Sequence, residues 1–204
     1  MITIIDYGLG NLGSILSMLR RTGHQAQVSS DVEVIARAEK LILPGVGAFD
    51  AGMRQLEQNG LREILTTRVL HDGVPFLGIC LGMQLMFEGS QEGALKGLGW
   101  FPGRFTRFPA AHEGASLRVP HMGWNFVEPV RSKRLFQDAA ERPRFYFIHS
   151  YRLVETDLAD VAATALYGGR FVCAVERDNL MGVQFHPERS HRYGIALLKA
   201  FASS

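Results

Sequence analysis

The stretch "PFLGICLGMQLMF", residues 75–87, joins an apolar run to an amphipathic one through the pattern Gly-x-Cys-x-Gly. The apolar run up to Ile79 predicts a buried strand, and a helix is expected from about Met83. Such a strand–turn–helix unit is typical of a nucleophile elbow, in which small residues two positions either side let the backbone pass. We therefore interpret Cys80 as a nucleophile, although a lone cysteine is more often a small buried hydrophobe.

Short apolar runs alternate with amphipathic stretches on the N-terminal side of this unit. We expect strands in "MITIID", at residues 25–28, in "KLILPG" and in "VPFLGI", and helices at residues 12–22, in "SDVEVIARA" and within residues 49–71. Ser30 and Glu33 have the spacing of a capping box at the start of the second helix. Alternation at this spacing predicts right-handed βαβ units and a parallel sheet with helices on both faces.

The sequence after Gly89 is richer in short aromatic and β-branched runs broken by glycine or proline. These runs predict strands and hairpins, with a turn at "YGGRF" and a last helix over residues 193–201. We expect one α/β domain over residues 1–204, with an open mixed, mostly parallel sheet and a β-rich second half. Residues 104–118 allow no interpretation.

Composition excludes several classes of function. The formal net charge of +2 and the lack of a basic tract argue against nucleic-acid binding. No apolar run reaches the length of a membrane span, and no signal region precedes "MITIID", so we expect a cytoplasmic protein. Its two cysteines make no disulfide framework. The histidines and cysteines lack zinc-type spacing, and we expect neither a metal nor a cofactor.

One motif points elsewhere. "GLGNLG", residues 8–13, matches the dinucleotide-binding pattern G-x-G-x-x-G between an expected strand and helix. The second strand ends in "VSSD", however, with serines where a ribose-binding acid is expected and Asp31 slightly late. A dinucleotide-binding oxidoreductase stays an alternative, which binding of NADH would favour.

A base for Cys80 is found far downstream, in "VQFHPE". If residues 183–185 form a strand, His186 lies at its carboxyl end, where α/β enzymes place their chemistry. Glu188 is two residues further, so in extended chain both side chains point the same way. A carboxylate there orients the imidazole toward the thiol, which gives a Cys–His–Glu triad for acyl transfer and disfavours a non-catalytic binding module.

Acyl transfer also needs an oxyanion hole. The backbone N–H of Leu81, the residue after the nucleophile, is one expected donor. The glycine-rich stretch "LPGVGAF", residues 43–49, is a second source of backbone N–H groups.

The motifs "GICLGMQ" and "QFHPE" together resemble those of the class I (triad) glutamine amidotransferases. "DYGLGN", "LPGVGAF", "PHMGWN" and "FYFIHSY" narrow the resemblance to the glutaminase subunits of imidazole glycerol phosphate synthases, from histidine biosynthesis, along the whole chain. The resemblance implies a flavodoxin-like sheet and hydrolysis of glutamine to glutamate and ammonia through a cysteinyl thioester. It also implies glutamine contacts at Gly47, Gln84 and the backbone of His149, Ser150 and Tyr151. A paralogue that feeds another synthase, such as one modifying a sugar, stays an alternative.

The resemblance further implies a partner, a (β/α)₈-barrel cyclase subunit that receives the ammonia through a channel. Free ammonia is largely protonated in neutral water and then cannot act as a nucleophile, so we expect it to be used in place. Because the glutaminase motifs leave no room for an acceptor domain, the acceptor is expected on a partner chain. Trp124 is the first candidate for an interface anchor, because exposed tryptophans are frequent hot spots. Weaker candidates are Tyr7, Asn11 and Arg189.

Regulation is expected at "PGVG". The oxyanion donor there is expected to be the N–H of Val46, and a β-branched residue resists the positive-φ conformations that glycine enters freely. We hypothesise that this peptide rests turned away from the cleft and turns inward when the loaded partner docks.

Overall fold

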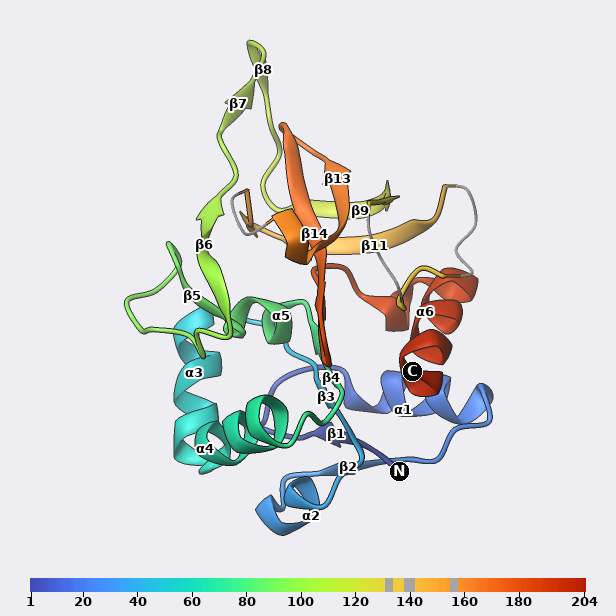
Figure 1. Ribbon diagram of the computed structural model, residues 1–204. Coiled ribbons are helices and arrows are strands. Elements are labelled where there is room, and N and C mark those ends of the chain that lie inside the picture. The colour runs from blue at the N-terminus through green and yellow to red at the C-terminus, as the bar shows by residue number, and fades with distance from the viewer. Residues whose placement is uncertain (131–133, 138–141, 155–157) are drawn as a thin grey trace.

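An eight-stranded sheet in the order β10-β13-β14-β15-β4-β3-β1-β2 forms the centre of the computed structural model (Figure 1). The structure describes residues 1–130, 134–137, 142–154 and 158–204. The parallel strands are β1 (Ile2–Ile5), β2 (Ala26–Ser29), β3 (Lys40–Leu43), β4 (Phe76–Ile79) and β15 (Leu180–Val183). Antiparallel strands extend the sheet beyond β15, namely β14 (Arg170–Arg177), β13 (Val161–Leu166) and β10 (Glu128–Pro129). The predicted mixed α/β sheet is confirmed.

Helices cover both faces of this sheet, so it has a hydrophobic core on each side. Alternation within β1 shows the division, because Ile2 and Ile4 pack into one core and Ile5 into the other. The first core is closed by α1 (Leu12–Arg21) and α6 (His191–Ser203). The second is closed by α2 (Val32–Ala36), α3 (Phe49–Gln58), α4 (Leu61–Thr66), the π-helical turn Thr67–His71 and α5 (Leu81–Leu85). None of the helices in the described part of the chain is long and apolar enough to cross a membrane.

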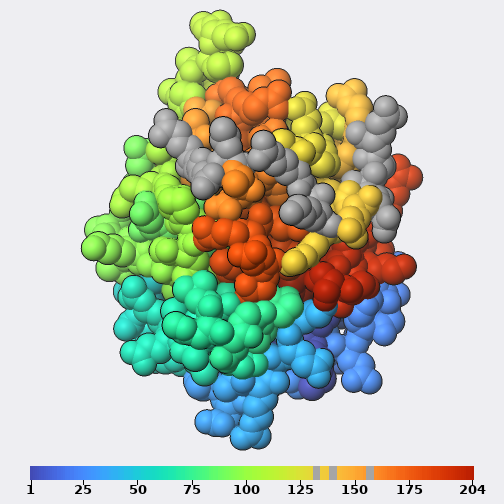
Figure 2. Space-filling view, viewed as in Figure 1, coloured from blue at the N-terminus to red at the C-terminus, as the bar shows by residue number. Residues whose placement is uncertain are grey.

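Smaller sheets form part of the second half and lie beside the carboxyl ends of β4 and β15. One contains β5 (Phe87–Ser90), β6 (Phe101–Arg107) and β12 (Tyr151–Arg152), and another pairs β9 (His121–Phe126) with β11 (Arg144–His149). The remaining elements are the hairpin β7 (Ala111–His112)–β8 (Ala115–Ser116) and the 3₁₀ turns Leu158–Asp160 and Pro187–Arg189. The segment that the sequence left uninterpreted is the end of β6 and this hairpin, which protrudes from the body (Figures 1 and 2).

Two local predictions are wrong. Asp31, not Ser30, caps α2: the helix begins at Val32, and the Asp31 carboxylate accepts a hydrogen bond from the N–H of Glu33 at 2.8 Å. The strand before His186 ends at Val183 rather than Phe185. Beyond that point the N–H of Gln184 donates to Cys173 O and the N–H of His186 donates to Tyr146 O. The chain therefore leaves β4, stays paired with β14 and meets β11.

Candidate active site

Cys80 lies in the turn between β4 and α5, and its backbone has the strained conformation of an elbow. Its φ of 54° lies in the region that side-chain-bearing residues avoid, and ψ is −109°. The neighbouring glycines make the turn possible: a Cβ on Gly82 would lie 1.8 Å from Leu43 O, and one on Gly78 would lie 2.8 Å from Gly82 O. Helix α5 starts at Leu81, two residues earlier than expected, so the elbow leads directly into the helix.

His186 and Glu188 form the second part of the site. His186 Nδ1 and Glu188 Oε1 are 2.7 Å apart, and the two side chains are only 4% and 3% exposed. His186 Nε2 has no hydrogen bond that meets ordinary geometry within the described residues, but Cys80 is close enough for its charge to act on the ring. The predicted triad residues are therefore brought together, with Glu188 behind the imidazole and Cys80 before it.

The electrostatics of the triad favour a protonated imidazole. Burial on its own lowers the pKa of His186, but negative charge on Cys80 and on Glu188 raises it more, to about 10. An imidazolium beside a sulfur nucleophile can donate a proton to a leaving group.

Gln184 also reaches Cys80, a contact that the sequence interpretation missed. Its Nε2 donates to Cys80 Sγ at 3.7 Å, and its Oε1 accepts from Gln84 Nε2 at 3.1 Å. The position of Gln184 could have indicated this contact. It lies two residues before His186 in extended chain, so both side chains point to the same side.

A cleft of about 460 Å³ opens beside Cys80, and all five predicted substrate contacts line it. Its lining contains the predicted residues Val46, Gly47, Leu81, Gln84, His149, Ser150 and Tyr151, and also Ala48, Glu92, Pro120 and Ile148. Glu92 was missed because nothing in "SQEGALKG" separates it from an ordinary surface acid. Its Oε2 accepts from the N–H of Phe49 at 2.8 Å, which fixes a carboxylate at the edge of the cleft.

The predicted oxyanion donors do not point at one position. The N–H of Leu81 donates to the carbonyl oxygen of Gly45 at 3.4 Å. The peptide that follows Gly45 is trans, so its N–H, which belongs to Val46, points opposite to that carbonyl. It is Gly47 rather than Val46 that has positive φ, at 115°. The arrangement leaves the Val46 N–H turned away from Leu81.

His149 contributes to the cleft from a buried pair of histidines. His149 Nδ1 lies 2.8 Å from Tyr151 O, its Nε2 lies 3.0 Å from His121 Nδ1, and His121 Nε2 lies 3.2 Å from Asn125 Nδ2. Burial lowers the pKa of His121 to about 4 and that of His149 to about 3, so both rings are neutral near pH 7. Because the His149 ring is engaged in this chain, only its backbone and neighbours remain to contact a ligand.

The predicted interface residues differ in exposure. Trp124 is 43% exposed and stacks on His191 with ring centroids 5.5 Å apart. Asn11 and Arg189 are also exposed. Tyr7 is only 1% exposed, so its prediction as a surface contact is wrong: its ring packs in the core beside Cys80, with its hydroxyl against Gly45.

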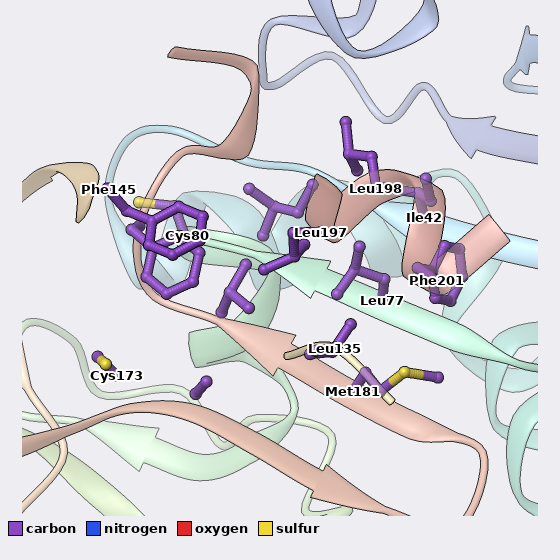
Figure 3. Close-up of a cluster of buried hydrophobic side chains, with 14 of the residues drawn as sticks. Ile42, Leu77, Cys80, Leu135, Phe145, Cys173, Met181, Leu197, Leu198 and Phe201 are labelled. Atoms are coloured by element: carbon purple, nitrogen blue, oxygen red, sulfur yellow. The ribbon is translucent and has the colours of Figure 1, made fainter. Parts of the chain in front are cut away.

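The other cysteine lies apart from this site. Cys173 is fully buried in β14, and burial raises the pKa of its thiol well above the usual range. Figure 3 shows it in the same apolar cluster as Cys80 but set apart from it. Among the residues that the structure describes, no group of three or more His, Cys, Asp or Glu side chains could hold a metal ion.

Comparison with known proteins gives consistent results. The family model described as glutamine amidotransferase class-I matches residues 3–203. The chain is 45% identical over 201 residues to an imidazole glycerol phosphate synthase subunit HisH 2 of Methanococcus maripaludis, and 48% identical to the protein of that name from Pseudomonas aeruginosa. In each case 98% of both chains is covered. A glutamine amidotransferase of known structure has a similar fold, with a TM-score of 0.72 at 18% identity over 97% of this chain and 99% of that one.

Proposed function

The chain belongs to the class-I glutamine amidotransferase family, and on this premise we propose that it is the glutaminase subunit of an imidazole glycerol phosphate synthase. In that role it hydrolyses glutamine and passes the ammonia to a cyclase subunit that makes imidazole glycerol phosphate and an aminoimidazole carboxamide ribotide in histidine biosynthesis. The full-length relatives that carry that name support the proposal. The observation that carries the chemistry is the approach of a buried His186–Glu188 pair to Cys80 on a strained elbow.

The first half-reaction forms a thioester. Cys80 Sγ attacks the side-chain amide carbon of glutamine, and the amide nitrogen takes a proton from His186 Nε2. The carbon–nitrogen bond then breaks, so ammonia leaves and a γ-glutamyl thioester remains on Cys80. The raised pKa of His186 means that the required proton is in place at the start.

The second half-reaction releases glutamate. Neutral His186 takes a proton from water, and the resulting hydroxide attacks the thioester carbon. Breaking the carbon–sulfur bond frees glutamate and returns the proton and the thiolate to the pair. Glu188 holds Nδ1 throughout, which keeps Nε2 directed at the reacting atoms.

We assign glutamine to the cleft beside Cys80. Gly47, Gln84 and the segment His149, Ser150 and Tyr151 line this cleft. Glu92 places a carboxylate at the edge, which suits the α-ammonium group of an amino acid.

The oxyanion hole is proposed to form only in the complex. Turning the Gly45–Val46 peptide over would release the Leu81 N–H from Gly45 O and bring the Val46 N–H beside it. Two donors would then face the carbonyl oxygen of the substrate. The exposed position of Val46, 46% accessible, leaves this peptide within reach of a docking partner.

The partner is proposed to be a (β/α)₈-barrel cyclase that docks on the exposed face of β9. Met122, Trp124 and Phe126 alternate on this face and are all exposed. The neighbouring strand β11 is joined to the catalytic segment, because the N–H of His186 donates to Tyr146 O and the N–H of Tyr146 donates to Ser190 Oγ. A protein on this face therefore lies one strand away from His186.

We place the reaction in the cytoplasm. The two cysteines are free and buried, and a free nucleophilic thiol suits a reducing compartment.

The proposal is tested by adding glutamine to the chain with and without a barrel cyclase and its ribonucleotide substrate. We expect glutamate release to depend on Cys80 and the cyclase to form its imidazole product from that ammonia. Cys80→Ala should lower turnover by at least about 10³-fold, while Cys173→Ala, which removes a thiol remote from the cleft, should retain it. Unchanged turnover in Cys80→Ala would refute the mechanism. Product formation only with an unrelated synthase would refute the histidine-pathway partner.

A further inference from the structure

The side chain of Gln184 is fully buried and hydrogen-bonded at both ends of its amide. Nε2 donates to Cys80 Sγ at 3.7 Å, within the range of a bond to sulfur, and Oε1 accepts from Gln84 Nε2 at 3.1 Å. With Gln84 Nε2 as the donor, Gln184 Oε1 faces Gln84, which leaves Gln184 Nε2 facing the sulfur of Cys80. The amide therefore joins the nucleophile to Gln84, a residue that lines the cleft.

The backbone fixes the position of this amide independently of its side-chain contacts. The N–H of Gln184 donates to Cys173 O at 2.9 Å, and the N–H of Cys80 donates to Val183 O at 2.8 Å. Both residues are thus held by the ends of neighbouring strands, and Gln184 has little freedom to move away from the thiol. Since His186 lies two residues further along extended chain, Cys80 has an amide donor and an imidazole on one side of its turn.

A bond from an amide N–H to sulfur favours the charged form of a thiol, because the thiolate is the stronger acceptor. It also limits rotation of the Cβ–Sγ bond, which places the sulfur for attack. An aliphatic side chain would fill the same buried space without either effect. The choice of a glutamine at a wholly buried position, where polar groups need partners, is explained by these two bonds.

We propose that Gln184 takes part in catalysis, its amide holding the Cys80 sulfur as a thiolate aimed at the cleft while its oxygen fixes Gln84 for the substrate. This inference rests on the proposed function, since it assigns Gln184 to the same nucleophile. It adds to the triad a fourth side chain that touches the reacting atom.

The test compares two variants of the full chain. Gln184→Met removes the donor to sulfur and breaks the bond to Gln84. Gln84→Met breaks only the bond between Gln184 and Gln84. The difference in Cys80 alkylation between the two variants therefore reports the contact between Gln184 and Cys80. The readout is the rate of alkylation of Cys80 by iodoacetamide from pH 5 to 10, followed by mass spectrometry of its peptide so that Cys173 does not interfere.

We expect the pH midpoint of Cys80 alkylation to rise by about one unit in Gln184→Met, which corresponds to roughly tenfold slower alkylation below the midpoint. In Gln84→Met the midpoint should stay within about 0.3 units of wild type, while the KM for glutamine rises. If Gln184→Met does not fold, as judged by circular dichroism, the alkylation of Cys80 is measured in Gln184→Glu instead. That variant still accepts from Gln84 but places a carboxylate at the sulfur, so the rise should be larger.

Equal midpoints in the wild type and in the folded Gln184 variant would overturn the inference, as would an equal rise in Gln84→Met. Alkylation needs neither glutamine nor a partner, so these results are independent of the proposed function. Full glutamine hydrolysis by Cys80→Ala would instead refute the proposed function whatever the midpoints are.

Discussion

The backbone N–H of Leu81 donates to the carbonyl oxygen of Gly45 across 3.4 Å, which ties the residue after the nucleophile to the glycine-rich strand end after β3. One donor expected to stabilise the tetrahedral intermediate is therefore already occupied. The other, on Val46, belongs to the same peptide as the occupying carbonyl and points the opposite way. Turning the Gly45–Val46 peptide over would free the Leu81 N–H and bring the Val46 N–H beside it.

The first prediction concerns the isolated chain. With the Gly45–Val46 peptide in its present orientation, glutamate release should be slow, and the substrate-loaded cyclase should raise kcat by about 10²–10³-fold, the usual worth of an oxyanion donor. Steady-state glutamate assays with and without the loaded partner measure this ratio. Alkylation of Cys80 under the same conditions serves as a control, because it requires no oxyanion hole. Equal kcat values in both states would contradict the idea that the peptide limits the rate.

The second prediction concerns Glu188→Gln. The amide keeps the size of the carboxylate but cannot stabilise an imidazolium, so kcat should fall by about 10²–10⁴-fold with a smaller change in KM. Titration of the His186 ring by NMR should show a pKa below the value of about 10 that the native pair has. An unaltered pKa would mean that Glu188 does not act on the ring.

The same variant changes the pH dependence of stability. The folded-state pKa of His186 is raised to about 10, above the value near 6.5 of an unfolded histidine. Its stabilising contribution is therefore fully present below about pH 6.5 and is lost as pH rises through about 10. Urea unfolding at pH 6 and pH 10 should show a smaller loss of unfolding free energy in Glu188→Gln than in the wild type.

The third prediction concerns the glycine at the start of α5. Gly82→Ala would place a methyl group 1.8 Å from Leu43 O, and neither backbone segment can move without disturbing the elbow. We expect a loss of about 3 kcal/mol or more in the free energy of unfolding. Gly13→Ala in α1 is the matched control, because nothing lies within 4 Å of the added methyl and alanine favours a helix, by up to about 1 kcal/mol. Similar stabilities for the two variants would show that the close approach to Leu43 relaxes easily.

The fourth prediction concerns the proposed docking face. Trp124→Ala should weaken binding of the barrel subunit by about 30-fold or more, as expected for a central aromatic anchor. Fold and thermal midpoint should change little, since the side chain is 43% exposed. Leu70→Ala, at a residue 47% exposed on the π-helical turn, should leave binding unchanged. Calorimetric titration of the barrel subunit into each variant measures the two affinities. Equal affinities for Trp124→Ala and Leu70→Ala would show that β9 is not part of the interface.

The sequence predicted what depends on short patterns. The alternation of elements, the elbow at Cys80 and the pairing of His186 with Glu188 are local in sequence, so spacing and glycine placement identify them. The same reasoning placed Ser30 instead of Asp31 at the cap of α2, because two capping residues stood side by side. The approach of His186 to Cys80 was predicted from the chemistry that a nucleophile requires, but other contacts between distant segments were not predictable. The bond between Gln184 and Cys80 joins positions 104 residues apart and depends on the register of β15 against β4.

The positions of these two strands along the chain also set the order in which the parts of the site are synthesised. β4 and Cys80 leave the ribosome long before β15, His186 and α6, yet these late segments become the immediate neighbours of the elbow. A nascent chain can thus present its thiol but has no acid to release ammonia. Ammonia production therefore requires the last strand of the sheet to have folded against β4.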